Sequence, residues 1–132
     1  MINKSDRNLR YQLNAWIVAR FIEAIYNRNT LDRLPDFVAK TCRFCHEQAV
    51  IGESLDDIRI HFVYTWINQE AVFHRVEYRM EEIMTHRDIV SVKVRRSGKV
   101  KADGPVVSEL SRWEMFQLHE GKIIQRWIAN AS

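Results

Sequence analysis

The sequence is poor in the residues that mark linkers and repeats. Its 132 residues include only four glycines and two prolines, and no low-complexity stretch or internal repeat interrupts the chain. A chain of this length is that of one ordinary domain, in which a single core buries most of the apolar surface. We therefore expect residues 1–132 to form one domain.

Long apolar stretches are also missing. The longest falls far short of the roughly 20 residues that a helix needs to cross a bilayer. Residues 1–8 carry neither the apolar segment nor the small-residue cleavage site of a signal peptide. We expect a cytoplasmic protein with no membrane partner.

The excess of basic residues is small. Twenty basic residues oppose 17 acidic ones, which leaves a net charge of +3. The basic cluster Arg95, Arg96, Lys99 and Lys101 surrounds Gly98 without the interleaved aromatic side chains that a nucleic-acid surface uses. The cluster is typical of a solvated hairpin tip, and we predict no nucleic-acid partner.

The first part of the chain has the period of an amphipathic helix. Over residues 6–26, the apolar side chains at this spacing are Leu9, Leu13, Ile17, Phe21 and Ile25. They predict one long helix with a broad buried face. Trp16 widens the apolar stripe and is assigned to the core.

Two further helices are expected before the strands begin. Thr30 is placed to cap a short helix over residues 31–38. A third helix is expected to open after Gly52, with Ser54 as its N-cap. Its apolar stripe reaches Trp66, which is also assigned to the core.

From residue 72 the pattern alternates, which is the period of β-strands. One strand face carries Val72, His74, Val76, Tyr78 and Met80, of which Met80 is assigned to the core, and a later strand repeats the pattern at Val90, Val92 and Val94. Glu120 and Gly121 separate the last two strands, and the glycine supplies the positive φ that a tight hairpin turn needs. Successive hairpins predict an antiparallel, strongly bent sheet that cups the helices.

The strand expected over residues 106–118 has apolar side chains on both faces. Val107, Trp113 and Met115 load one of them. Because helices cover only one face of such a sheet, the other is expected to meet a second subunit. Together with Trp127, these side chains predict a homodimer with a two-fold interface.

Three stretches resemble one superfamily. They are Arg-Phe-Ile-Glu-Ala-Ile-Tyr-Asn-Arg-Asn-Thr-Leu at residues 20–31, Gly52 before the third helix, and Phe-Gln-Leu-His-Glu-Gly-Lys-Ile-Ile at residues 116–124. With this order of helices and strands, nearly the whole chain resembles the nuclear transport factor 2-like, or SnoaL-like, superfamily. The resemblance implies a cystatin-like α+β fold, a cone-shaped roll in which a strongly bent antiparallel sheet wraps around three N-terminal helices.

The resemblance implies no particular reaction. The superfamily includes ketosteroid isomerases, polyketide cyclases, dehydratases, limonene epoxide hydrolases and non-catalytic binding domains, so fold does not fix function. Phe21 stands where the isomerases carry a catalytic tyrosine. Val94, Arg96 and Ile128 stand where the epoxide hydrolases carry Asp, Arg and Asp. Neither of these two chemistries is therefore predicted.

Residues 42–46, Cys-Arg-Phe-Cys-His, have the spacing of a c-type haem attachment site. Attachment of c-type haem takes place outside the cytoplasm, and the sequence shows no export signal that would take the protein there. The resemblance places the segment on the first strand, where Cys42 and Cys45 would point to opposite faces with Cα atoms about 10 Å apart, too far for a disulfide. A zinc site would need a further Cys or His pair at ligand spacing. We predict no haem, no metal and no other cofactor.

The resemblance also implies where a site lies. In catalytic relatives a general base sits at the end of the first strand and a second polar group projects inward from a later strand, which here gives His46 and Glu114 as catalytic candidates. Burial could raise the pKa of Glu114 and make it a hydrogen-bond donor, or Arg112 could hold it ionised. We assign Arg112, His74 and Tyr78 to ligand binding.

These residues favour acid–base chemistry, such as isomerisation, cyclisation or dehydration, on a small, largely apolar or aromatic molecule. Two alternatives stay open: a cavity that binds without catalysis, and a dimeric module whose apolar sheet face serves a protein partner. Whether the protein is an enzyme is left open. The other histidines fall at helix-surface or turn positions and receive no role: His61, His86 and His119.

Overall fold

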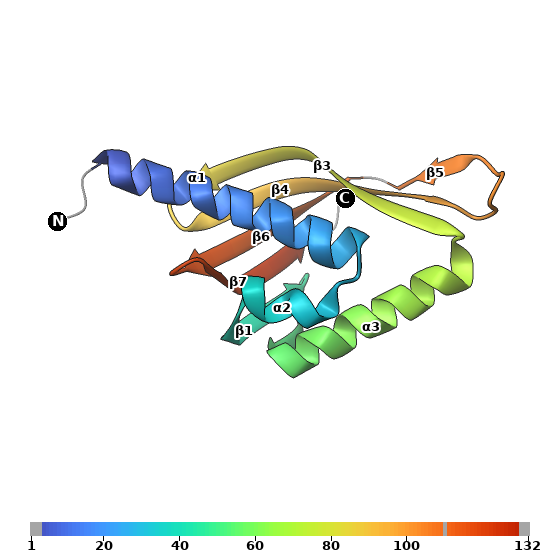
Figure 1. Cartoon of the computed structure of the whole chain (residues 1–132), viewed down its shortest axis with the longest axis horizontal. Coiled ribbons are helices and arrows are strands. Elements are labelled where there is room, and N and C mark those ends of the chain that lie inside the picture. The colour runs from blue at the N-terminus through green and yellow to red at the C-terminus, as the bar shows by residue number, and fades with distance from the viewer. Residues whose placement is uncertain (1–3, 110, 130–132) are drawn as a thin grey trace.

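The helices lie on one face of a curved seven-stranded sheet in the computed structural model, which describes residues 4–109 and 111–129 (Figure 1). The helical segments are α1 (Lys4–Phe21), the π-helix η1 (Ile22–Asn27), the 3₁₀-helix η2 (Leu31–Arg33), α2 (Leu34–Phe37) and α3 (Leu55–Val72). The strands are β1 (Val38–His46), β2 (Ala49–Ser54), β3 (Arg75–His86), β4 (Ile89–Lys99), β5 (Val106–Ser108), β6 (Arg112–His119) and β7 (Lys122–Ala129). The expected α+β roll is confirmed.

The long first helix changes type before it ends. After Phe21 the chain widens into η1, where the Arg28 N–H donates to the Glu23 carbonyl at 3.1 Å, five residues back. Each residue in a π-turn is rotated relative to its place in an α-helix. The wider turn buries Ile22, Ile25 and Tyr26 together.

The predicted buried stripe of α1 is wrong in its first half. Leu13 and Trp16 are 50% and 58% exposed, and Arg20 stacks over the Trp16 ring at 4.8 Å. The buried side chains in this part of the helix are Val18, which also belongs to the expected apolar stripe, and Asn14, one position after Leu13. The helix is therefore rotated about its axis from the expected orientation, and Trp16 does not belong to the core.

Local signals explain how α3 begins. The Ser54 side chain accepts a hydrogen bond from the Asp57 N–H at 3.2 Å, so the predicted cap is confirmed. The helix begins after Gly52, as expected, and Gly52 itself lies in β2. A Cβ at this position would stand 2.7 Å from the Asp57 Cβ, so the close approach of β2 to the helix start requires glycine.

The sheet differs from the expectation in one pairing. Its order is β2-β1-β7-β6-β4-β3, with β5 paired to β4. All pairs are antiparallel except β1 with β7, which run parallel. The sheet is thus mixed, and two strands rather than one precede α3. The strand expected over 106–118 is divided into β5 and β6.

The predicted hairpin turn between β6 and β7 is confirmed. Glu120 and Gly121 have φ angles of 49° and 78°, and His119 pairs with Lys122 across the turn. Positive φ at both central residues is the requirement of a type I′ turn, whose twist matches that of the strands.

Side chains on the inner face form rows across the strands. One row holds Val90, Phe116, Arg126 and Phe44, and the next holds Val92, Glu114, Ile128 and His46. Phe21 packs edge-on against Phe44 and Phe116 to join the helices to this face. Met80, expected in the core, is 37% exposed; it lies opposite the buried Val94, but on β3, which is an edge strand of the sheet.

Cys42 and Cys45 are buried free thiols, and no disulfide joins them. None of the helices in the described part of the chain combines the length and the apolar character that a membrane-spanning helix needs.

Candidate functional site

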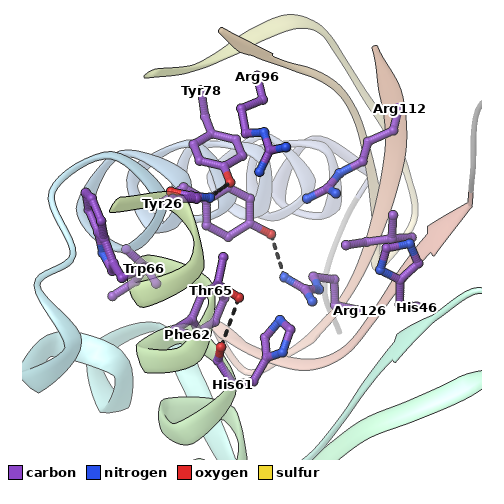
Figure 2. Close-up of a pocket in the computed structure, with 13 residues that line it drawn as sticks. Tyr26, His46, His61, Phe62, Thr65, Trp66, Tyr78, Arg96, Arg112 and Arg126 are labelled. Carbon is purple, nitrogen blue, oxygen red and sulfur yellow. Dashed lines mark hydrogen bonds between the residues drawn. The ribbon is translucent and has the colours of Figure 1, made fainter. Parts of the chain in front are cut away.

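A cavity of about 200 Å³ lies between α3, the end of η1 and the inner face of the sheet (Figure 2). Ile25 and Tyr26 come from η1 and Phe62 and Trp66 from α3, so part of the wall is aromatic and apolar. The polar lining residues are His46, His61, Thr65, Gln69, Tyr78, Arg96, Arg112 and Arg126. The arrangement is a small, partly open site with an apolar wall and several convergent polar groups, which is typical of ligand pockets.

Three of the predicted site residues border this cavity. His46 lies at the end of β1, Tyr78 in β3 and Arg112 at the start of β6. The Tyr78 hydroxyl accepts a hydrogen bond from the Gln69 side chain, which fixes it against α3. The sheet thus brings together side chains from three strands that are far apart in sequence.

His74 does not join them. The strand begins one residue later, at Arg75, and His74 is exposed with its N–H donating to the Lys99 carbonyl at 2.6 Å. The expected alternation from Val72 onward fails because α3 continues through Val72. His74 therefore lies away from the cavity.

Glu114 lies next to the cavity but does not line it. Its side chain is fully buried, and its Oε2 is 3.2 Å from the Arg112 Nε. Of the two arrangements considered for Glu114, the structure shows the contact with Arg112. His46 and Glu114 both pair with Ile128 of the intervening strand, which sets their Cα atoms about 10 Å apart at the usual strand spacing.

Tyr26 connects Glu114 to the cavity. Its hydroxyl donates to the Glu114 Oε1 and accepts from the Arg126 Nη1 at 2.7 Å, the contact drawn in Figure 2. Burial first, and then the charge of Glu114, raise the pKa of Tyr26 above its ordinary range against the opposing effect of Arg126. The hydroxyl therefore stays protonated and acts as a neutral donor.

Arg126 is the least expected member of the site. Only 1% of its surface is exposed, and its Cζ lies 4.5 Å from the Phe44 ring centre and 5.6 Å from that of Phe62. A guanidinium over aromatic faces is stabilised by their quadrupoles. Its Nη1 is 4.0 Å from the Glu114 Oε1.

Tyr26, His61 and Arg126 belong to the site although the sequence pattern did not single them out. Phe21, the position expected to replace a catalytic tyrosine, is core, and a tyrosine hydroxyl is supplied one turn later by Tyr26. The sequence did contain a signal for His61. It lies three residues after Ile58, and this spacing places both side chains on the same face of the helix, next to Phe62. Arg126 was hidden because a bulge between β6 and β7 breaks the alternation of the last strand.

The polar end of the cavity carries more positive than negative charge. Burial, and then the charges of Arg126, His46 and Arg112, lower the pKa of His61 to about 4, so its imidazole is neutral at pH 7. Arg96 is matched outside the cavity by Glu109, whose Oε2 accepts from its Nε at 3.0 Å. No three His, Cys, Asp or Glu side chains within residues 4–109 and 111–129 gather in a way that could hold a metal ion.

By sequence, no family model and no curated protein matches the chain. By structure, it is similar to a protein described as a SnoaL-like polyketide cyclase from Jannaschia sp. CCS1, with 16% identity, a TM-score of 0.73, and 98% of this chain and 90% of that one covered. It is similar to a protein with a ketosteroid isomerase-like fold from Catenulispora acidiphila, solved with trimethylamine, at 13% identity, TM-score 0.66 and 87% and 85% coverage.

A further similar structure is an LEH-like epoxide hydrolase of M. tuberculosis, with 9% identity, a TM-score of 0.67, and 91% of this chain and 85% of that one covered. These proteins are described in different functional terms but have one architecture, and identities this low establish architecture alone. The chain has the cone-shaped α+β fold of the nuclear transport factor 2-like, or SnoaL-like, proteins.

Proposed function

We propose that this protein is a small-molecule pocket protein that performs acid–base chemistry on a small, largely apolar or aromatic carbonyl compound. The observation that carries the proposal is that an imidazole, His46, faces the same cavity as the Tyr26 hydroxyl and the Arg126 guanidinium. Solved neighbours described as a polyketide cyclase and a ketosteroid isomerase-like protein support the same direction.

His46 is the candidate general base. It stands at the rim of the inner sheet face, half-buried, where a ligand in the cavity can reach it. Histidine changes charge near neutral pH, which suits the removal of a proton from carbon beside a carbonyl group. His61, whose imidazole is held neutral, can orient the ligand as a hydrogen-bond partner.

Arg126 is the candidate group that stabilises the negative charge formed when the proton leaves, and Tyr26 holds its guanidinium in place through the Nη1–H hydrogen bond. As His46 takes the proton, the electron pair of the C–H bond moves toward the carbonyl oxygen and forms an enolate. A buried guanidinium near that oxygen favours the negative charge because its own positive charge is already in place and oriented. Glu114 takes no part in the transfer and acts as a positioning residue for Tyr26 and Arg112.

The proposal is tested by hydrogen–deuterium exchange at carbon. Acetophenone, 1-tetralone and 2-tetralone are incubated with the protein in D₂O, and loss of the α-proton signal is followed by NMR. We expect exchange faster than in buffer, and a drop of about 10²–10⁴-fold in His46→Ala. His86→Ala, which changes an exposed histidine, should leave the rate unchanged. Exchange that is equal in wild type and His46→Ala would contradict the proposal.

A non-catalytic binding role is the second candidate, and one observation favours it. Of the two predicted catalytic residues only His46 borders the cavity, since Glu114 is sealed behind Tyr26. A ketone that binds with a measurable Kd but exchanges no faster than in buffer would support binding without catalysis.

We also propose that the protein forms a homodimer through the outer face of the sheet. Opposed residues of five strands make one row there: Ser91, Met115, Trp127, Cys45 and Val50. Ile89, Met115 and Trp127 border a shallow, mainly apolar hollow on this face. Val107, expected in the same patch, lies apart on β5 against Gly98. Helices cover only the opposite face, so a second copy is the occupant that closes this one.

A further inference from the structure

We infer that the cavity recognises a carboxylate group, which binds side-on to the guanidinium of Arg126. The inference rests on the proposed function in one respect, that this cavity is the ligand site. It adds the chemical class of the ligand, a small aromatic or alicyclic acid.

The hydrogen bonds of Arg126 leave one edge of its guanidinium unused. Nη1 donates to the Tyr26 hydroxyl at 2.7 Å. Nε and Nη2 have no hydrogen-bond partner among the residues that the structure describes. Because the group is planar, the N–H bonds of Nε and Nη2 point the same way and form a two-pronged fork. This fork matches the two oxygens of a carboxylate in spacing and in charge.

The burial of Arg126 suggests that a ligand pairs with this unused edge. Arg126 borders the cavity, yet only 1% of its surface is exposed to solvent. Buried polar groups are paired in the great majority of proteins, and an unpaired charged donor costs more than a neutral one. A ligand that provides two acceptors would therefore be bound more tightly than one that provides none.

The charges around Arg126 point to an anion. Arg112 holds the Glu114 carboxylate at 3.2 Å, whereas Arg126 is 4.0 Å from it, so one carboxylate serves two guanidinium groups. Arg96 is already matched by Glu109, and His61 is neutral at pH 7. One further negative charge in the cavity would balance Arg126.

The volume of the cavity and its aromatic walls limit the size and the polarity of the part of the ligand that carries the carboxylate. Ligand pockets for drug-sized molecules measure roughly 300–1,000 Å³, and an apolar cavity of about 150 Å³ holds benzene. At about 200 Å³, this cavity suits a single ring with one acid group. The rings of Phe62 and Trp66 line it and would contact the ring of the ligand.

Benzoate and its neutral analogue benzamide provide the test. Their binding to the full chain is measured by titration calorimetry at pH 7.5, and by the fluorescence of Trp66 relative to a Trp66→Phe variant. We expect benzoate to bind at least tenfold more tightly than benzamide. Arg126→Gln should weaken benzoate on the order of 10- to 100-fold, as expected for hydrogen bonds to a charged group, and leave benzamide nearly unchanged.

Arg96→Gln is the matched control, since it removes a guanidinium that lines the cavity but is already paired with Glu109. It should keep the preference for benzoate. Should Arg126→Gln fail to fold, the Nε–H signal of Arg126 in wild-type protein replaces it, and benzoate but not benzamide should shift that signal in NMR spectra.

Equal affinity for the two probes, or a preference that survives in Arg126→Gln, would overturn the inference. Its outcome is separate from that of the proposed function. If ketone exchange depends on His46 but benzoate is not preferred over benzamide, the proposed acid–base chemistry stands and the carboxylate site is wrong. If benzoate is preferred but the ketones do not exchange, the carboxylate site stands and the proposed acid–base chemistry is wrong.

Discussion

His61 makes the stability of this fold depend on pH. Its pKa is lowered to about 4 in the folded protein by burial, and then by the charges of Arg126, His46 and Arg112, against about 6.5 in an unfolded chain. The unfolded chain therefore binds the proton more readily. The contribution of His61 is fully present above about pH 6.5 and is lost as the pH falls toward 4.

We expect the urea midpoint to fall between pH 6.5 and 4, and to fall less steeply in His61→Gln. His86→Gln, in which an exposed histidine is replaced, should retain the wild-type slope. Unfolding curves at four or five pH values in this interval measure both. A slope that is identical in wild type and His61→Gln would show that His61 is not the group responsible.

The turn between β6 and β7 sets the register of both strands that carry the buried charges. Gly121 has a φ of 78°, and a Cβ there would meet only the Ile17 Cδ1 at 3.9 Å, so strain rather than collision opposes another residue. We expect Gly121→Ala to lower the free energy of unfolding by about 1–2 kcal/mol. Denaturant unfolding of the purified variant measures this.

Gly104→Ala serves as the comparison. Gly104 also lies in a turn, where its N–H donates to the Lys101 carbonyl at 3.1 Å, but its φ is not in the left-handed region and an added Cβ would make ordinary contact. It should change the free energy of unfolding by less than about 0.5 kcal/mol. Equal losses in the two variants would mean that the backbone angle of Gly121 is not the cause.

Whether an element could be predicted from the sequence depended on its regularity. Alternation placed Val90, Val92 and Val94 of β4 correctly, and all three are buried. The resemblance placed Glu114 on the inward face of its strand, and the structure has it there beside Arg112, opposite Val92 and Val94, because β6 has no bulge across these residues. Alternation failed at Arg126, where a bulge between β6 and β7 shifts the side chains that follow, and at Met80, which lies on the edge strand β3. Bulges depend on how two strands fit together, and one strand's pattern does not contain this.

The helices show the same limit. The cap of α3 could be predicted because Ser54 and the Asp57 N–H are neighbours in sequence. The inward position of Tyr26 could not, because it depends on the π-turn of η1. That turn is stabilised by tertiary contacts: the Asn27 side chain accepts from the Tyr78 N–H at 2.7 Å and donates to its carbonyl at 2.9 Å.

At the scale of the whole molecule, the outer sheet face predicts how the protein assembles. Met115 is 40% exposed in the apolar row that we assign to the dimer interface. Placing a carboxylate in the core of such an interface is unfavourable because the charge loses water without gaining a partner. We expect wild-type protein to sediment at micromolar concentration with twice the mass of one chain, and Met115→Glu to sediment as a monomer.

Ile67→Glu controls for the added charge. Ile67 is an exposed apolar residue of α3, outside the proposed interface, and the variant should remain dimeric. A monomeric wild type, or dissociation of both variants alike, would contradict the proposed interface. Circular dichroism of each variant should match wild type, since neither side chain belongs to the core.

The central place of β7 bears on how the chain folds. It is the last strand of the described chain, yet it lies between β1 and β6 and carries Arg126, whose partner Tyr26 is 100 residues away in sequence. Contacts this distant form only after a large loss of chain entropy, so they favour slow folding. Until β7 is in place the sheet is split and β1 lacks its parallel neighbour. During synthesis, a chain that still lacks β7 lacks Arg126 and Ile128 of the cavity lining, so a ligand that needs Arg126 can be bound only after β7 has been made and inserted.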